Sequence, residues 1–293
     1  MVGAGPAGLS CALTAAERGH AVTLFEAGER IGGQLNLARN VAGKEEFDET
    51  LRYYAIRLAQ AGVDVRLSAK AAASDLAHGF DEVVVATGAR PRVPDIAGID
   101  HAKCVSYADL LSGKRQAGQQ VVIIGAGGIG FDVAEYLLQA GNADDDARDA
   151  FLSHWGVEAG MTHRGALTKA ADHAPPRKIT MLQRKAGRMG RSLGVSTGWI
   201  LRLELARANV KQISGVAYER IDDAGVHITV DGAQRTIPAD TVVIAAGQDE
   251  ERSLYADLAA AGRSCHLIGG AERSAELDAV RAIDEGLRLA LTF

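Results

Sequence analysis

Two glycine-rich loops have the spacing that cradles the phosphates of a dinucleotide. They are Gly3-Ala4-Gly5-Pro6-Ala7-Gly8 and Gly125-Ala126-Gly127-Gly128-Ile129-Gly130. In such a loop the first glycine makes a tight turn, the second lets the backbone approach a pyrophosphate, and the third lets the following helix pack against the strand. The N-terminus of that helix adds free N–H groups and the positive end of its dipole. Glycine makes up 34 of 293 residues, so one match alone means little and the pair carries the prediction.

The residues that end the next strand differ between the two loops. After the first loop, the strand over 21–25 ends at Glu26, where a carboxylate can accept hydrogen bonds from an adenosine ribose. After the second loop, the strand over 179–182 leads through a glutamine into Arg184 and Lys185. This basic pair would neutralise a 2′-phosphate that a carboxylate would repel, which predicts NADPH rather than NADH. The alternatives are an exposed strand end for Glu26 and a solvated basic surface for the pair.

An internal repeat indicates which elements position these loops. Residues 81–88 and 240–247 are similar apolar strands that each end in a small-residue turn, where backbone can come close to a cofactor. The turn residues are Thr87, Gly88 and Gly247. The distance from the glycine loop to this strand is 78 positions in the first copy and 115 in the second. The difference nearly equals the length of the polar segment 142–176, which predicts that this segment is a surface insertion. Alternating apolar residues over 210–237 predict antiparallel strands.

These elements predict an α/β fold of two Rossmann-like dinucleotide-binding domains, one inserted into the other. The FAD-binding domain comprises residues 1–111 and 240–293, and the NADPH-binding domain comprises 112–239 with the polar insertion near 142–176. A glycine pair at the end of residues 266–270 precedes a helix, and backbone N–H groups there can approach a flavin.

Composition excludes several classes of function. The net charge of −5 gives no general attraction to nucleic acid or an anionic membrane, and no apolar run reaches the roughly 18–20 residues that span a bilayer. No basic-then-apolar leader opens the chain. Cys11, Cys104 and Cys265 form no CxxC pair, which argues against a disulfide-reductase mechanism and fits a reducing cytoplasm. The eight histidines show no metal-ligand spacing, so we expect no metal site.

Several stretches resemble the C-terminal half of bacterial NADPH-dependent 2,4-dienoyl-CoA reductases, in the old yellow enzyme/trimethylamine dehydrogenase group. The resemblance covers essentially the whole chain. The stretches are Gly32-Gly33-Gln34, Gly43-Lys44-Glu45-Glu46-Phe47, 125–132, 181–185, Thr197-Gly198-Trp199-Ile200, 266–270 and Glu276-Leu277-Asp278-Ala279.

The resemblance implies roles for the residues that match. FAD would be contacted by Ala7, Glu26, Gly33, Gln34, Lys44, Gly270, Leu277, Asp278 and Ala279. Arg184 and Lys185 would hold the 2′-phosphate of NADPH, and Trp199 would form part of the wall where nicotinamide meets flavin. The alternatives are core packing for Trp199 and a solvated helix for Lys44. Residues 270–275 depart from the family's usual sequence, which leaves the flavin contacts there open.

The resemblance also implies a second half. Family members carry an N-terminal TIM barrel with FMN, the dienoyl-CoA site and a [4Fe–4S] cluster on four cysteines, and three scattered cysteines cannot supply that cluster. Only Met1 and Val2 precede the first loop, where a strand usually brings about five or six residues. We therefore expect a truncated piece or a late-called start.

The resulting hypothesis is a module that transfers hydride from NADPH to FAD and passes electrons to the missing half, which reduces 2,4-dienoyl-CoA. The hydride step needs no protein acid or base, so no catalytic side chain is nominated. The alternatives are a freestanding NADPH:acceptor reductase that feeds a ferredoxin or quinone, and a nucleotide-binding remnant without turnover.

Overall fold

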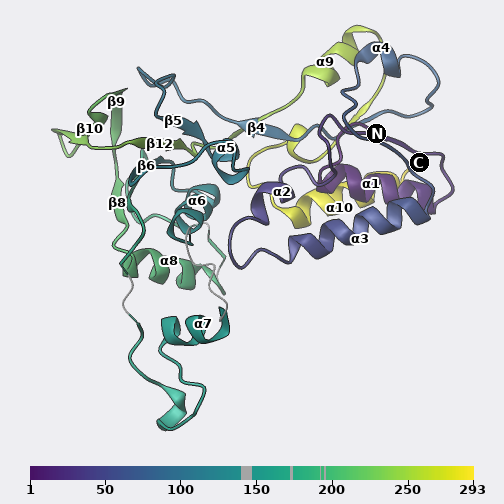
Figure 1. Ribbon diagram of the computed structural model, residues 1–293. Helices are drawn as coiled ribbons and strands as arrows, with labels where there is room; N and C mark the ends of the chain where they lie inside the picture. The colour runs from purple at the N-terminus through teal and green to yellow at the C-terminus, as the bar shows by residue number, and fades with distance from the viewer. Residues whose placement is uncertain (140–146, 172–173, 192, 195) are drawn as a thin grey trace. The chain divides into compact units, whose positions relative to one another are not determined.

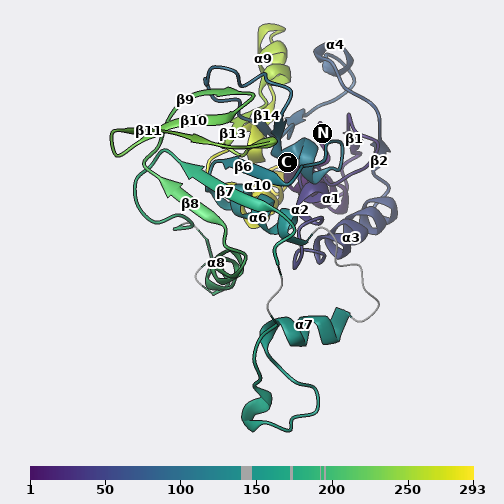
Figure 2. The same ribbon diagram turned by 60° about the vertical axis from the view of Figure 1, so that its left-hand side comes forward.

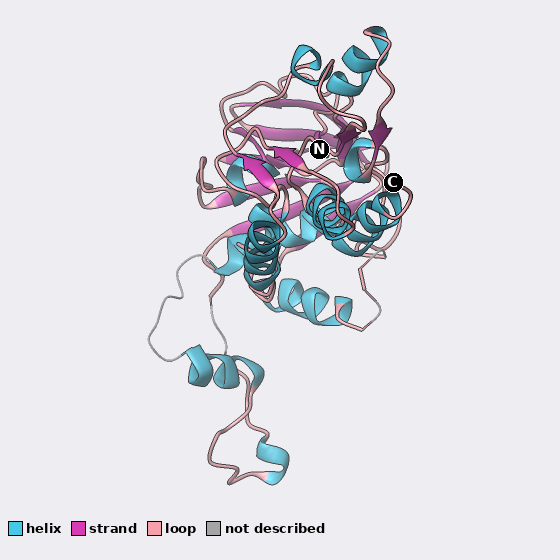
Figure 3. Cartoon of the chain, turned by 90° about the vertical axis from the view of Figure 1, so that its right-hand side faces the viewer, coloured by secondary structure: helices cyan, strands magenta, loops and turns pink. Residues whose placement is uncertain are grey.

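Strands and helices alternate along most of the chain, as expected for an α/β protein (Figure 3). The computed structural model describes residues 1–139, 147–171, 174–191, 193–194 and 196–293. The chain divides into two compact units. Unit 1 comprises Met1–Pro94, Ser106–Arg115 and Ile244–Phe293, and unit 2 comprises Asp95–Val105 and Gln116–Val243. The predicted fold class is confirmed. Within the described ranges, no helix is long and apolar enough to cross a membrane.

Unit 1 contains short parallel strands and the helices that pack on them. Its helices are α1 (Pro6–Glu17), α2 (Leu35–Ala38), α3 (Phe47–Gln60), α4 (Ala73–Leu76), α5 (Tyr107–Leu111), α9 (Ser253–Ala260), the short 3₁₀ helix η2 (Gly269–Ala271) and α10 (Ala279–Ala290). Its strands are β1 (Thr23–Phe25), β2 (Asp64–Arg66), β3 (Val84–Val85), β4 (Ala89–Pro91), β13 (Gln248–Glu250) and β14 (His266–Leu267). Strand β1 pairs with β2 and β3 with β14, both in parallel, while β4 pairs with β13 in antiparallel.

The first two residues occupy the place between β1 and β3. Val2 bridges Phe25 on one side and Val85 on the other, both in parallel. Its N–H donates to Val84 O at 2.9 Å, and its own carbonyl accepts from Ala86 N at 2.7 Å. Val2 therefore lies between β1 and β3 and leads directly into the first glycine loop.

Helix α1 packs closely against α10, and small residues make this possible (Figure 1). A Cβ atom on Gly286 of α10 would lie only 2.2 Å from Ala7 O of α1. Ser10 Oγ donates to Ile283 O at 2.8 Å, which ties the two helices at the same level. The helix that follows the first loop is thus anchored by the end of the chain.

Unit 2 is built on a five-stranded sheet and a separate three-stranded sheet (Figure 2). Its strands are β5 (Cys104–Ser106), β6 (Gln120–Ile124), β7 (Lys178–Gln183), β8 (Lys211–Ser214), β9 (Ala217–Asp222), β10 (Gly225–Val230), β11 (Ala233–Ile237) and β12 (Thr241–Ile244). Its helices are α6 (Gly128–Gln139), α7 (Ala147–Trp155), the 3₁₀ turn η1 (Arg164–Ala166) and α8 (Gly198–Arg207). The larger sheet has the order β5-β12-β6-β7-β8, and the antiparallel sheet has the order β11-β10-β9.

The units divide at other residues than the predicted cofactor domains. Strand β12 lies between β5 and β6, so residues up to Val243 belong to unit 2. Asp240 strengthens this attachment, because its Oδ2 accepts from Gln119 N at 2.8 Å and Gln120 N at 2.9 Å at the start of β6. Residues 95–105, predicted in the first domain, also lie in unit 2.

The described part of the predicted insertion packs against α8. His154 Nε2 of α7 lies 2.8 Å from Glu204 Oε1 of α8. The guanidinium carbon of Arg207 lies 5.1 Å from the centroid of the Trp155 ring, within cation–π range. Residues 142–146 and 172–173 of the predicted insertion lie outside the described residues.

Candidate functional site

The first glycine loop shows a separate structural reason for each glycine. Gly3 has a φ of +101°, and a Cβ there would lie 2.3 Å from Ala86 O. A Cβ on Gly8 would lie 1.9 Å from Gly3 O, so both positions exclude a side chain. Around Gly5, in contrast, a Cβ would meet no atom within 4 Å. Gly3 and Gly8 are thus required by the fold, while Gly5 borders open space that a pyrophosphate can enter.

The second loop repeats this geometry. Gly125 has a φ of +118°. A Cβ on Gly130 would lie 2.2 Å from Gly125 O, whereas Gly127 and Gly128 border open space. Helix α6 begins at Gly128 and continues through Ile129. The two loops therefore have the same division between glycines that pack and glycines that face outward.

Both helix N-termini remain available to an anion. Helix α1 has Gly5 as its N-cap with no side-chain cap, and Pro6 stands in its first turn. Neither α1 nor α6 has an acidic residue in its first turn. The positive end of each helix dipole is therefore not neutralised by the first turn itself, and the backbone N–H groups there need an acceptor. These residues fit the phosphates of a dinucleotide.

Glu26 ties the first loop to the end of β1. Its Oε2 accepts from Ala4 N at 2.8 Å, and its Oε1 accepts from Gly28 N at 2.7 Å. A carboxylate has about four acceptor positions, so two remain for hydroxyl donors such as those of a ribose. Glu26, which the sequence predicts to bind a ribose, thus also fixes the backbone of the loop. The sequence did not indicate this second role.

The basic pair lies beside the second loop. Gly125 N donates to Leu182 O at 3.0 Å, which places the end of β7 next to the loop. Arg184 and Lys185 are both exposed, and within the described ranges neither forms an ion pair. Gln183 Nε2 donates to Lys185 O at 2.7 Å and holds the backbone there. Two cations without a carboxylate partner at this position are suited to a phosphate.

The Gly32–Gln34 turn meets the first loop directly. Gly33 has a φ of +52°, and a Cβ on it would lie 3.0 Å from Gly5 Cα. Gln34 Nε2 donates to Ala89 O at 3.0 Å, and its Oε1 accepts from Gln248 Nε2 at 2.7 Å. The Gln34 amide is therefore held by the protein and keeps one N–H for another acceptor.

Sequence reasoning missed the partners of Gln34. Gln248 Nε2 also donates to the hydroxyl of Tyr107 at 2.7 Å, and burial raises the pKa of that phenol. Gln248 directly follows the predicted turn residue Gly247, which was the only local signal for it. Lys44 is half-buried in the segment that follows the Gln34 helix, and its N–H donates to Val41 O at 3.1 Å.

The two echoing turns come together in unit 1. Arg92 N donates to Gly247 O at 3.0 Å, and Glu251 N donates to Gly88 O at 3.0 Å. Thr87 Oγ1 donates to Glu251 O at 2.5 Å. The β4–β13 ladder between these bonds explains the pairing, and no local pattern in the sequence indicates it.

The second predicted flavin turn lies against the first. A Cβ on Gly270 would lie 2.8 Å from Leu277 Cδ2 and 3.1 Å from Gly88 C, so only glycine fits there. Asp278 is the N-cap of α10, and its Oδ1 accepts from Arg281 N at 2.8 Å. Ala279 is the first residue of that helix. The structure thus groups the predicted residues near Gly88, Gly270 and Leu277.

Trp199 is the second residue of α8 and is 54% exposed. This exposure argues against packing in the core of unit 2 and leaves the indole free for a ligand. Its role at the nicotinamide stays a prediction.

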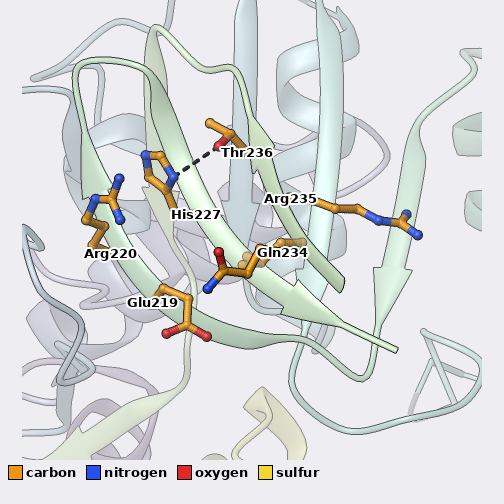
Figure 4. Close-up of a pocket in the computed structure, with 7 residues that line it drawn as sticks. Glu219, Arg220, His227, Gln234, Arg235 and Thr236 are labelled. Carbon is orange, nitrogen blue, oxygen red and sulfur yellow. Dashed lines mark hydrogen bonds between the residues drawn. The ribbon is translucent and has the colours of Figure 1, made fainter. Parts of the chain in front are cut away.

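A polar cavity of about 220 Å³ lies on the three-stranded sheet of unit 2 (Figure 4). Its wall is formed by Glu219, Arg220, His227, Ile228, Gln234, Arg235 and Thr236. His227 Nε2 lies 2.8 Å from Asp222 Oδ1, and this hydrogen bond is the main cause that lowers the pKa of Asp222 to about 2. The cavity contains none of the predicted cofactor residues, so we assign it no role in dinucleotide binding.

Comparisons with known proteins agree with this geometry. Residues 1–272 match the family model of pyridine nucleotide-disulphide oxidoreductases. A metal reductase of Desulforamulus reducens is 32% identical over 98% of this chain, and a cinnamate reductase of Clostridium sporogenes is 28% identical over 93%. The chain covers only 43% and 36% of those two proteins.

Solved structures share the fold. The 2-naphthoyl-CoA reductase in complex with 2-naphthoyl-CoA has a TM-score of 0.81 at 28% identity, over 100% of this chain and 39% of that one. Thioredoxin reductase of T. acidophilum has a TM-score of 0.66 at 18% identity, over 99% of this chain and 95% of that one, a likeness of fold alone. All three cysteines of the present chain are free thiols.

Proposed function

The chain belongs to the pyridine nucleotide-disulphide oxidoreductase family, and on that premise we propose that it is an NADPH-dependent flavoprotein reductase module. Family membership implies FAD and NAD(P)H as cofactors. The observation that carries the proposal is the pair of equivalent glycine loops, one followed by Glu26 and the other by the exposed Arg184 and Lys185. When bound, FAD supplies an acceptor for a hydride from NADPH and a donor of electrons onward.

The residues of the chain contribute binding and orientation. Gly5 leaves room for the FAD pyrophosphate at the N-terminus of α1, and Glu26 offers its remaining acceptor positions to the ribose. Gly88 and Gly270 bring backbone close together at the turn where we place the flavin. Arg184 and Lys185 hold the 2′-phosphate of NADPH by charge-assisted hydrogen bonds.

We propose that the electrons leave for a further domain or partner protein. The supporting observation is that the chain spans less than half the length of the curated relatives described above. The resemblance to 2,4-dienoyl-CoA reductases favours a conjugated acyl-CoA as the final substrate, with an FMN and [4Fe–4S] domain between. The cinnamate and 2-naphthoyl-CoA reductases named above also act on conjugated compounds.

A second candidate is a freestanding NADPH:acceptor reductase. It is favoured by the thioredoxin reductase fold, which this chain matches over 95% of that protein's length. A disulfide substrate is not part of this candidate, because Cys11 is buried and the three thiols form no pair in sequence. A ferredoxin or quinone is the acceptor to test.

The test is to purify the chain, measure its flavin content, and add NADPH without oxygen. We expect a yellow protein whose absorbance near 450 nm is bleached by NADPH within seconds. A colourless protein that takes up no added FAD would overturn the proposal and favour a remnant without turnover. Reoxidation by ferredoxin or quinone alone, without a further domain, would favour the second candidate.

A further inference from the structure

The segment Gly269–Ser274, which joins β14 to α10, is held by charged side chains from other elements. At its start, Gly269 N donates to Glu285 Oε2 of α10 at 2.7 Å. In its middle, Arg252 Nε donates to Ala271 O at 2.8 Å, and Arg252 also donates to the next carbonyl, that of Glu272. The backbone of the segment is thus fixed from two sides before it reaches its end.

The end of the segment is fixed as well. Arg281 Nη2 donates to Arg273 O at 2.5 Å. Ser274 donates to Glu250 Oε1 through its backbone N–H at 2.9 Å and through its hydroxyl at 2.8 Å. These bonds are the main cause that lowers the pKa of the Glu250 carboxyl to about 2. We call the four residues Arg252, Glu250, Arg281 and Glu285 the charged clamp.

Two members of the clamp depend on each other. Arg281 and Glu285 stand one turn apart on α10 with Nε and Oε1 3.6 Å apart, and their side chains are only 17% and 25% exposed. Arg281 Nε and Nη1 are buried without a hydrogen-bond partner among the described residues. The charge of Glu285 is therefore what compensates this cation, and its loss leaves a buried charge unpaired.

Close packing at Gly269 and Gly270 also restricts the backbone of the clamped segment. Gly269 has a φ of +66°, and a Cβ on it would lie 2.8 Å from Ala7 Cβ in the first turn of α1. Gly270 has no room for a side chain beside Gly88.

We propose that the charged clamp preorganises Gly269–Ser274 for the flavin, with Arg281 and Glu285 as positioning residues that do not touch the cofactor. The inference rests on the proposed function, because it assigns the segment to FAD. Preorganisation removes the cost of ordering the segment when the cofactor binds, so FAD affinity depends on residues outside the contact surface.

The same helix offers a matched control. Asp284 and Arg288 form an ion pair of the same spacing on α10, with Oδ2 and Nε 2.6 Å apart, but their side chains are 47% and 76% exposed. No hydrogen bond of this pair reaches the 269–274 segment in the part of the chain that the structure describes. Both Glu285→Ala and Asp284→Ala remove one negative charge from α10, and the side chains removed differ by one methylene. Only Glu285→Ala removes a member of the charged clamp.

The experiment measures FAD affinity of the apo-protein by fluorescence titration, and amide exchange over 269–274 without FAD. For Glu285→Ala we expect amide exchange in that segment to be about tenfold faster and FAD to bind about tenfold more weakly. Amide exchange in the strands of unit 2 should not change. Asp284→Ala stays within about twofold of the wild type in both. Glu285→Gln, which keeps an acceptor for Gly269 N but not the charge, gives an intermediate loss and also serves if Glu285→Ala fails to fold.

Three outcomes overturn the inference. Wild-type FAD affinity in Glu285→Ala or Glu285→Gln would do so while the proposed function stands. Weaker FAD binding with unchanged exchange over 269–274 would show that Glu285 acts otherwise than by ordering the segment. Absence of FAD binding by the wild-type chain would instead overturn the proposed function, and the flavin role of the clamp with it.

Discussion

The two glycine loops share their backbone and differ in the side chains that follow them. In both, the third glycine packs on the carbonyl of the first, and the middle glycines border open space. After β1, however, Glu26 is held by two backbone N–H groups, whereas after β7 the basic pair is exposed and without ion-pair partners among the described residues. The backbone geometry of both loops is therefore set by steric contacts, while the nucleotide preference that we propose depends on the end of one neighbouring strand.

The largest effect should come from filling a packed glycine position. Gly8→Ala places a Cβ 1.9 Å from Gly3 O, so the backbone must move, and we expect a loss of about 3 kcal/mol in the free energy of unfolding. Urea denaturation followed by circular dichroism measures it. Gly5→Ala is the control, because its Cβ meets open space: stability should be retained while FAD affinity falls. Equal stability losses for the two variants would contradict the division of roles.

Next in size is the specificity of the second loop. Arg184→Ala removes a charge-assisted hydrogen bond, which is worth about 1.5–3 kcal/mol, so NADPH should bind roughly ten- to hundredfold more weakly while NADH changes little. Equilibrium titration with both nucleotides measures this. Lys178→Ala, an exposed cation at the opposite end of β7, is the matched control. A similar loss for NADH would sink the 2′-phosphate assignment.

A smaller effect is expected at the acid of the first loop. Glu26→Ala leaves Ala4 N and Gly28 N without their acceptor and should cost about 1.5 kcal/mol of unfolding free energy, together with a lower flavin content. Thermal unfolding and the ratio of absorbance at 450 and 280 nm give the two readouts. Glu29→Ala, four residues beyond the end of β1 and exposed, should change neither. Unchanged flavin content in Glu26→Ala would remove the ribose role.

The smallest effect is expected in the acid titration of Glu250 in unit 1, compared with that of Asp222 in unit 2. The hydrogen bonds from Ser274 lower the pKa of Glu250 from its ordinary 4.5 to about 2 in the folded state. These bonds therefore contribute their full stability above pH 4.5, and that contribution is lost as the pH falls toward 2. Ser274→Ala removes the hydroxyl donor but keeps the N–H, so the pKa of Glu250 should rise part of the way to 4.5. Carboxyl NMR titration measures it. Asp222 in unit 2, held by His227, should titrate as before, and a shift there would contradict a local cause.

Local signals in the sequence predicted the geometry of the two glycine loops but not the hydrogen-bond partners of Gln34. Glycine spacing and the type of residue after the next strand are short-range patterns, and they located Gly8, Gly130 and Glu26 where the structure has them. The hydrogen bonds of Gln34 to Ala89 and Gln248 join segments 55 and 214 residues apart, which no local pattern reports.

The division of the strands shows the same limit. Residues 81–88 and 240–247 read alike because buried parallel strands are apolar throughout, and that pattern does not say which sheet each strand joins. The structure places β3 beside β14 and β12 beside β6. The sequence likewise did not predict a role for Glu285 and Arg281, because an i,i+4 ion pair on a helix is ordinarily a surface feature.

The contact between α1 and α10 has a consequence for synthesis. Ser10 and Ile283 are 273 positions apart, so the first helix leaves the ribosome long before its partner exists. At about 5–20 residues per second, α1 waits roughly 14 to 55 s with its small-residue face unprotected. The nascent chain is thus exposed to chaperones and proteases until α10 emerges, and slower codons between the two helices would lengthen that exposure.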